Sequence, residues 1–275
     1  MGKILAVWSD QKKTGKSVVT YMLANQIKKM ASKDLKLLVC CLNFKYSSLY
    51  KLFGIDEMST GMEELINYTL FEGESPQILE QMIPGKGSIY FTGSYRMTST
   101  FVKKNIEKYE KLLEELQKSF DLIIFDTVSG KENILTNLVL QKADVVLKLF
   151  NQDNESLGLI KEKGPGYNQE TIYLVSKYRN IYPRISDIQR RYSLKKVYTV
   201  EYCETLQEMK NRNSMHLYLQ HETQCNNSVK RLSRHVLDAL DLMPDEVVKE
   251  KTRNYIKIFS KYFVKPEMSG GRELR

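Results

Sequence analysis

Short apolar runs alternate along the chain with longer segments in which apolar residues recur every three or four positions. The first run, 4–8, predicts a buried strand, and the segment 16–30 after it predicts a helix. The same two patterns predict further strands at 35–42, 87–91, 122–125, 145–149, 171–175 and 196–200. They predict further helices at 62–71, 75–82, 101–118, 134–141 and 229–240.

Strands that alternate with helices predict an α/β fold with a mainly parallel twisted sheet and helices on both faces. We expect one domain over residues 1–242 and a C-terminal helical appendage, a basic amphipathic tail, over 243–275. In such sheets, ligands bind beyond the carboxyl ends of the strands. The residues that follow each predicted strand are therefore the candidates for ligand binding and chemistry.

Composition excludes several classes of protein. The 275 residues are 42% hydrophobic and 27% charged, as in an ordinary globular protein. No run approaches the roughly 18 apolar residues of a membrane-spanning helix, and the first residues lack the features of a signal peptide. The four cysteines form no CxxC pair, which argues against a disulfide scaffold and a zinc ribbon. We therefore expect a cytoplasmic protein, or one held peripherally at the inner face of the membrane.

Positive charge gathers in the second half of the chain. Residues 177–275 hold 20 Lys and Arg against 12 Asp and Glu, whereas residues 1–176 hold 22 against 21. Such a surplus is typical of a surface that meets nucleic acid or an anionic membrane, or of a solvated face. The basic residues expected at a DNA surface are Arg184, Arg190, Arg191, Lys195, Lys196, Lys230, Arg231 and Arg234.

The tail combines aromatic and basic residues. Between 247 and 264, Tyr255, Phe259 and Phe263 stand among several lysines. This composition is typical of a helix that lies in a membrane interface. A helix packed on the domain or on a partner protein has a similar composition, and both interpretations stay open here.

The clearest motif lies between the first predicted strand and the first predicted helix. It ends in Gly15, Lys16 and Ser17, at the point where backbone N–H groups and the helix dipole favour a phosphate. Gly15 allows close backbone approach, Lys16 can reach the β- and γ-phosphates, and the Ser17 hydroxyl can ligate Mg²⁺. The motif predicts a nucleotide site, although a plain strand-to-helix turn is the alternative.

One loop position departs from the standard phosphate-binding motif. Asp10 stands five residues before Gly15, where the motif has glycine. A carboxylate near phosphates is unfavourable unless a cation compensates it, and Lys12 and Lys13 are its neighbours in sequence. A second carboxylate, Asp126, ends the strand 122–125 and is followed by a short turn to Gly130.

These motifs together resemble the MinD/ParA family of deviant Walker ATPases. The resemblance extends over residues 1–242 and implies ATP, Mg²⁺ and a homodimer that encloses the nucleotides. It implies contacts to the nucleotide from the loop and from the start of the first helix. Those residues are Gln11, Lys12, Lys13, Thr14, Gly15, Lys16, Ser17 and Val18. Gln11 stands where the family has its signature lysine, and Lys12 could take over that role.

The resemblance also assigns roles outside the loop. Asp126 would hold Mg²⁺ through water together with Ser17, Gly130 would approach the γ-phosphate, and Ser176 would lie near the base. Asn43 stands where the family has the aspartate beside the attacking water. Because an amide cannot take a proton from that water, weak or lost ATP hydrolysis is expected.

Within the family, the strand end at Leu42 and Asn43 and the altered loop look most like the TadZ/CpaE branch. That branch positions Tad-type (Flp) pilus and secretion machinery, so its proteins would be partners. An active DNA-partitioning ATPase is the alternative within the family. An interaction scaffold that binds no nucleotide is the alternative from another class of protein.

Overall fold

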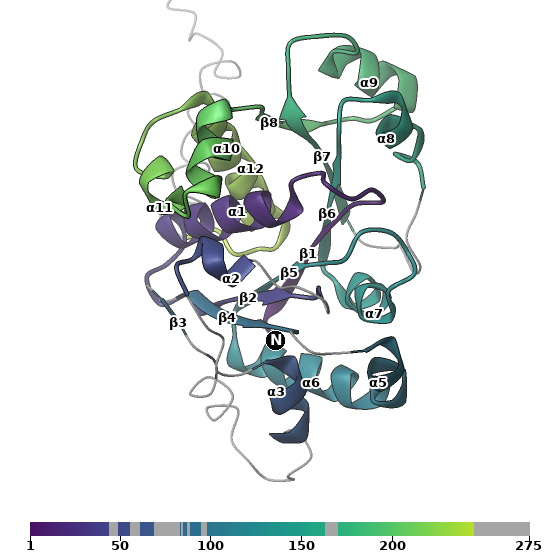
Figure 1. Cartoon of the computed structure of the whole chain (residues 1–275), viewed down its shortest axis with the longest axis vertical. Helices are drawn as coiled ribbons and strands as arrows, with labels where there is room; N and C mark the ends of the chain where they lie inside the picture. Colours follow the sequence, from purple (N-terminus) through teal and green to yellow (C-terminus); the bar gives the residue numbers. More distant parts are fainter. Residues whose placement is uncertain are drawn as a thin grey trace, which may run out of the picture.

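The computed structural model describes residues 1–43, 49–55, 61–68, 83, 85–86, 89–94, 98–162 and 170–244. In this part of the chain, eight strands form one sheet in the order β3–β4–β2–β5–β1–β6–β7–β8 (Figure 1). All neighbouring strands are parallel except β3, which runs antiparallel to β4. The strands are β1 (Lys3–Trp8), β2 (Leu37–Cys41), β3 (Gly85–Lys86), β4 (Ile89–Gly93), β5 (Leu122–Asp126), β6 (Val145–Phe150), β7 (Glu170–Tyr178) and β8 (Tyr198–Glu201).

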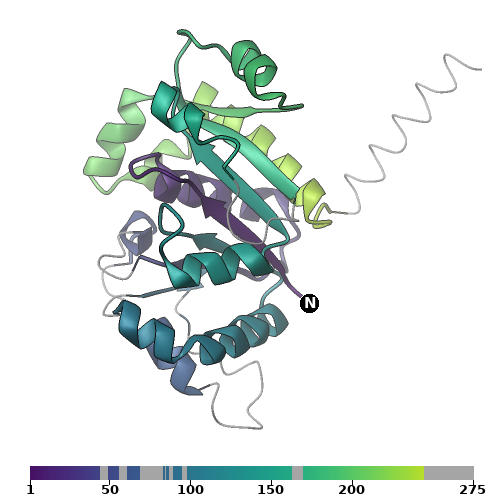
Figure 2. The same ribbon diagram turned by 90° about the vertical axis from the view of Figure 1, so that its right-hand side faces the viewer.

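Helices cover both faces of the sheet, which confirms the predicted α/β class (Figures 1 and 2). One face packs against α1 (Lys16–Met30), α2 (Leu49–Leu52), α10 (Glu204–Asn211), α11 (Met215–Tyr218) and α12 (Gln224–Ala239). The other packs against α3 (Met62–Tyr68), α5 (Ser99–Lys104), α6 (Ile106–Ser119) and α7 (Ile134–Lys142). A smaller apolar cluster lies under α8 (Asn154–Gly158) and α9 (Ile185–Tyr192).

The two main cores divide the side chains of each central strand by the two-residue period of the strand. Leu5 and Val7 of β1 enter the core beneath α1, whereas Ile4 and Ala6 enter the core beneath α6. A strand buried on both faces reads as a continuous apolar run, which is why β1, β2, β5 and β6 are visible in the sequence.

Several boundaries differ from the sequence-based prediction. The single helix expected over 101–118 is two helices, α5 and α6, because Asn105 leaves helical geometry with ψ at 19°. Its side-chain amide donates to the carbonyl of Phe101 at 2.9 Å, a bond that competes with helix continuation. Helix α12 begins at Gln224, capped by Thr223, rather than at 229. The helix expected over 75–82 lies outside the described residues.

Parallel order places the carboxyl ends of β1, β2 and β5 side by side. In the sheet register, Asp126 of β5 lies opposite Val7 of β1 and Cys41 of β2. The loop after β1, the strand end at Asn43 and the turn after Asp126 therefore converge on one edge of the sheet.

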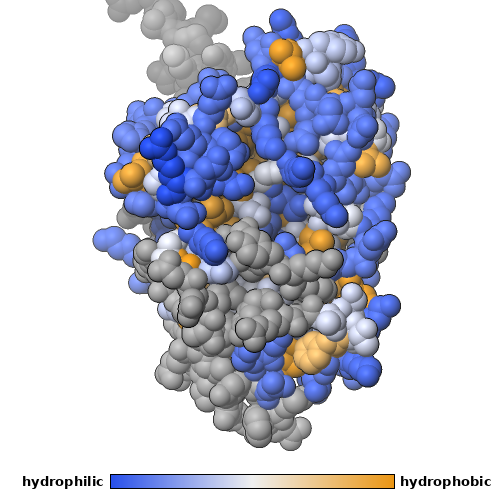
Figure 3. All heavy atoms as spheres, viewed as in Figure 1, coloured by the Kyte–Doolittle hydropathy of each residue, from blue (hydrophilic) through white to orange (hydrophobic). Residues whose placement is uncertain are grey.

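No helix in the described part of the chain is long and apolar enough to cross a membrane. The described surface seen in Figure 3 is largely hydrophilic, with small scattered apolar patches. Leu242 and Met243, just beyond α12, still pack against the core beneath α1. The aromatic and basic part of the tail lies outside the described residues.

Candidate nucleotide-binding site

The loop from Ser9 to Ser17 connects β1 to α1 and has the backbone geometry of a phosphate cradle. Lys13 and Gly15 adopt positive φ angles of 62° and 82°. Left-handed residues beside helical ones turn successive N–H groups toward one point, which forms a concave anion site. Val19 N–H donates to the carbonyl of Gly15 at 3.0 Å, so the helix begins directly behind the cradle.

The Lys16 side chain lies across this loop toward the turn after β5. Its Nζ is 2.5 Å from Ser129 Oγ and 3.2 Å from Ser9 Oγ. Burial lowers the pKa of the Lys16 ammonium, and the charge of Asp126 partly opposes that shift. Two neutral hydroxyls are weak partners for an ammonium, so an anionic ligand has a large electrostatic advantage at this position.

Ser17 and Asp126 form the second half of the site. Ser17 Oγ donates to Asp126 Oδ2 at 2.6 Å, while Asp126 Oδ1 is buried without a hydrogen-bond partner among the described residues. Burial raises the pKa of Asp126 to about 6, against the opposing effects of Ser17 and Lys16. A buried carboxylate oxygen beside a serine hydroxyl suits a hydrated Mg²⁺ that also binds phosphate oxygens.

The turn after Asp126 is tied to the phosphate loop by its backbone. Gly130 has φ at 84°, and its N–H donates to the carbonyl of Ser9 at 3.0 Å. The indole Nε1 of Trp8 donates to the carbonyl of Gly130 at 3.1 Å. These two hydrogen bonds therefore connect the turn to Ser9 of the loop and to Trp8 at the end of β1.

Two cavities flank the loop and share Lys13. The larger, about 660 Å³, is lined by predicted site residues from the loop, from the strand end after β2 and from β5. These are Lys12, Lys13, Lys16, Ser17, Asn43 and Asp126. The smaller cavity, about 310 Å³, is lined by Gly15, Val18 and Ser176 among others.

Gln11 and Thr14 line neither of these cavities. Thr14 is buried, and its hydroxyl donates to Ser9 Oγ at 2.9 Å. Its carbonyl accepts a hydrogen bond from Ser176 Oγ. Lys177, next to Ser176, donates from Nζ to the carbonyl of Lys13 at 2.7 Å. Thr14 and Ser176 thus shape the loop from behind.

Asp10 pairs with a lysine other than Lys12 and Lys13, the two that its sequence neighbourhood suggested. Its Oδ2 lies 2.8 Å from Nζ of Lys148, and the two side chains are 11% and 3% exposed. Lys12 and Lys13 instead line the larger cavity. Sequence reasoning missed Lys148, although one lysine inside the apolar run 145–150 was a signal.

Comparison with solved structures places this fold among the MinD and ParA ATPases. A ParA family ATPase from Chlorobium tepidum TLS superposes with a TM-score of 0.70 and 13% identity, over 86% of this chain and 98% of that one. A chain of the MinC:MinD cell division complex from Aquifex aeolicus gives 0.68 and 16%, over 86% and 96%. MinD from Pyrococcus horikoshii OT3 with Mg-ADP gives 0.66 and 15%, over 86% and 96%.

No protein-family model matches the chain, and no curated protein sequence matches it. The chain therefore has the fold of the MinD and ParA ATPases, while its loop carries Asp10 and Gln11, unlike the motif of that family.

Proposed function

We propose that the protein binds ATP with Mg²⁺ at the loop between β1 and α1. The observation that carries this proposal is the pairing of Ser17 with Asp126, whose second carboxylate oxygen is buried without a partner among the described residues. The same site offers Lys16 and the backbone cradle around Gly15 to the phosphates. One carboxylate and one hydroxyl suffice, because phosphate oxygens and water supply the remaining ligands of Mg²⁺.

The two cavities suggest how the nucleotide lies. The larger cavity holds the lysines and Asp126, and so suits the phosphates and the metal. The smaller cavity lies behind Gly15 and includes Ser176, Tyr202 and Leu206, which suit a base. Lys13 lines both cavities, and Gly15 lines the smaller one, where an added Cβ would lie 3.7 Å from the nearest atom, the Cε of Lys177.

Weak or lost hydrolysis is the second part of the proposal. Asn43 is exposed, follows the end of β2 and lines the larger cavity together with Asp126. It can orient a water by hydrogen bonding, but its amide cannot accept a proton from that water. The nucleotide then acts mainly as a ligand that stabilises one state of the protein.

We infer that this state serves to position a cellular assembly. Support comes from the shared fold with MinD and ParA proteins and from the Leu42–Asn43 strand end, which resembles the TadZ/CpaE branch. Partners would then be a second copy of this chain and components of a Tad-type pilus or secretion machine. An active DNA-partitioning ATPase and a nucleotide-free scaffold are the competing functions.

Calorimetric titration separates these functions. The protein is titrated with ATP and with ADP, in Mg²⁺ and in EDTA, and phosphate release is measured on the same samples. We expect ATP binding that is stronger with Mg²⁺ and turnover far below one per minute. Absence of binding under both conditions supports the scaffold, and rapid turnover supports the partitioning ATPase. Light scattering with ATP then tests the homodimer.

A further inference from the structure

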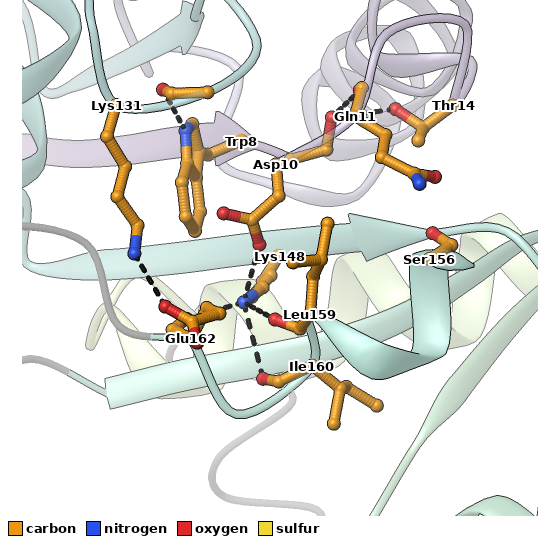
Figure 4. A network of polar contacts seen from close by, with 12 residues as sticks. Trp8, Asp10, Gln11, Thr14, Lys131, Lys148, Ser156, Leu159, Ile160 and Glu162 are labelled. Atoms are coloured by element: carbon orange, nitrogen blue, oxygen red, sulfur yellow. Dashed lines mark hydrogen bonds and ion pairs between the residues drawn. The ribbon is translucent and has the colours of Figure 1, made fainter. Parts of the chain in front are cut away.

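Lys148 is a buried cation in the middle of the central sheet. It belongs to β6, next to β1, and its side chain is 3% exposed. Figure 4 shows its ammonium between the phosphate loop and the segment after α8. Nζ pairs with Asp10 Oδ2 at 2.8 Å and donates to the carbonyls of Leu159 and Glu162 at 2.8 and 2.6 Å. A longer contact of 3.3 Å reaches the carbonyl of Ile160.

Because four acceptors surround it, this ammonium is held in one position inside the protein, unlike a mobile charge on the surface. Burial lowers the pKa of Lys148, and the Asp10 carboxylate opposes that shift. Its Nζ also lies 5.0 Å from the ring centroid of Trp8, within the range of a cation–π contact. Removal of one partner from such a buried pair leaves an uncompensated charge, which is strongly unfavourable.

The same ammonium completes a ring of contacts beside the proposed nucleotide site. Asp10 belongs to the loop, and Trp8 beside it donates to Gly130 of the turn after β5. Lys131 of that turn forms an ion pair of 3.0 Å with Glu162, whose carbonyl accepts from Lys148. The phosphate loop, the turn and the segment after α8 are thus held to one another (Figure 4).

We propose that Lys148 is a positioning residue of the nucleotide site. It neutralises Asp10 and holds that carboxylate on the β6 side of the loop, so that the loop can accept a polyphosphate although a carboxylate replaces its glycine. Without Lys148, the negative charge of Asp10 stays in the loop and repels the nucleotide. This inference rests on the proposed ATP site.

The test uses isosteric, uncharged replacements in the full chain. Lys148→Met should weaken ATP binding at least tenfold, and Asp10→Asn alone should change it by less than about threefold. The double variant Lys148→Met/Asp10→Asn should recover affinity to within about threefold of the parent. Lys3→Met is the matched control, since it also removes one lysine of an ion pair, with Asp144, but lies at the opposite end of β1 from the loop and leaves Asp10 paired. It should bind ATP nearly as well as the parent.

Rescue distinguishes positioning from general stabilisation. Calorimetric titration measures ATP affinity in every variant, while melting curves report stability. Should Lys148→Met not fold, Lys148→Gln serves instead, because it keeps donors for the carbonyls and removes only the charge.

Equal ATP affinity of the parent and the Lys148 variant overturns the inference. So does a folded double variant that binds as weakly as the single one, because Asp10 is then not the cause. A parent protein that binds no ATP at all overturns the proposed function and this inference together. Loss in the single variant with recovery in the double variant establishes it.

Discussion

Ser17 Oγ and Asp126 Oδ2 lie 2.6 Å apart, although 109 residues separate them in the sequence. The contact exists because β5 is the neighbour of β1, so that Asp126 ends its strand beside the start of α1. At the proposed nucleotide site, these two side chains would hold a hydrated Mg²⁺, Ser17 through its hydroxyl and Asp126 through water. Because they already lie side by side, the cost of organising them on binding would be small.

Replacement of Lys16 by alanine should remove ATP binding. The Lys16 ammonium stands next to Ser17 in the loop. Each hydrogen bond that it donates to a phosphate would contribute about 1.5–3 kcal/mol, the range for hydrogen bonds to charged groups. We expect a loss of about a hundredfold or more by calorimetry, with a melting temperature close to that of the parent. Lys118→Ala is the control, since Lys118 pairs with Glu115 on α6 and lines neither cavity. Unchanged affinity in Lys16→Ala contradicts the phosphate-loop interpretation.

The buried Asp126 should make stability depend on pH when nucleotide and Mg²⁺ are absent. Its pKa is about 6 in the folded protein and about 3.8 when exposed. Between these values the folded state binds more protons than the unfolded state, so the free energy of unfolding falls as pH rises from about 4 to 6. The fall is on the order of 3 kcal/mol for a shift of this size.

Comparison with Asp126→Asn isolates this effect. The variant lacks the titrating group, so its melting temperature relative to that of the parent should rise across pH 4 to 6.5. The attraction between Lys16 and Asp126 exists only while Asp126 is ionised, so its loss in the variant belongs to the same titration and adds no second pH effect. A constant difference between the two proteins across the range argues against a raised pKa.

The architecture was predictable from the sequence, because strands buried on both faces leave uninterrupted apolar runs. Gly15, Lys16, Ser17 and Asp126 were predictable for a related reason, since their positions next to such runs fix their place at the sheet edge. The short helices α8–α11 were not predicted. They are 4 to 8 residues long, too short to show a clear helical period.

The partner of Asp10 shows what local reasoning misses. Lys12 and Lys13 are close to Asp10 in sequence, but Lys148 reaches it because β6 lies beside β1 in the sheet. Strand order is a tertiary property and cannot be read from a window around the loop. The break between α5 and α6 at Asn105, by contrast, has a local cause, the hydrogen bond from its side chain to the Phe101 carbonyl. It was missed because the apolar pattern runs through both helices without interruption.

Asn43→Asp should raise the rate of ATP hydrolysis. The carboxylate would stand at the mouth of the larger cavity and could orient water and accept its proton, a contribution of 10²–10⁴ in established cases. We expect at least a tenfold increase in phosphate release, with ATP affinity within about threefold of the parent. The double variant with Lys16→Ala should show no turnover. An unchanged rate with intact binding points instead to Gln11, at the place of the family's signature lysine.

Removal of the tail should separate membrane binding from DNA binding. Truncation after Pro244 keeps Leu242 and Met243, which pack on the core, and deletes Phe259 and Phe263. Salt weakens attraction to vesicles and to DNA alike, so salt dependence does not distinguish them. Insertion of aromatic side chains does distinguish the two, because it stabilises binding to a membrane interface, whereas apolar groups add little affinity for DNA phosphates.

Sedimentation with anionic and with neutral vesicles is compared for the full chain and the truncated protein, with ATP present. We expect the full chain to bind anionic vesicles and the truncated protein to lose that binding. Any affinity for DNA should survive truncation, since Arg190, Arg191 and Lys230 are exposed on α9 and α12. A full chain that ignores anionic vesicles eliminates the membrane helix and favours a tail that packs on the domain or on a partner. Loss of DNA binding on truncation would show that the tail, and not these helices, contacts DNA.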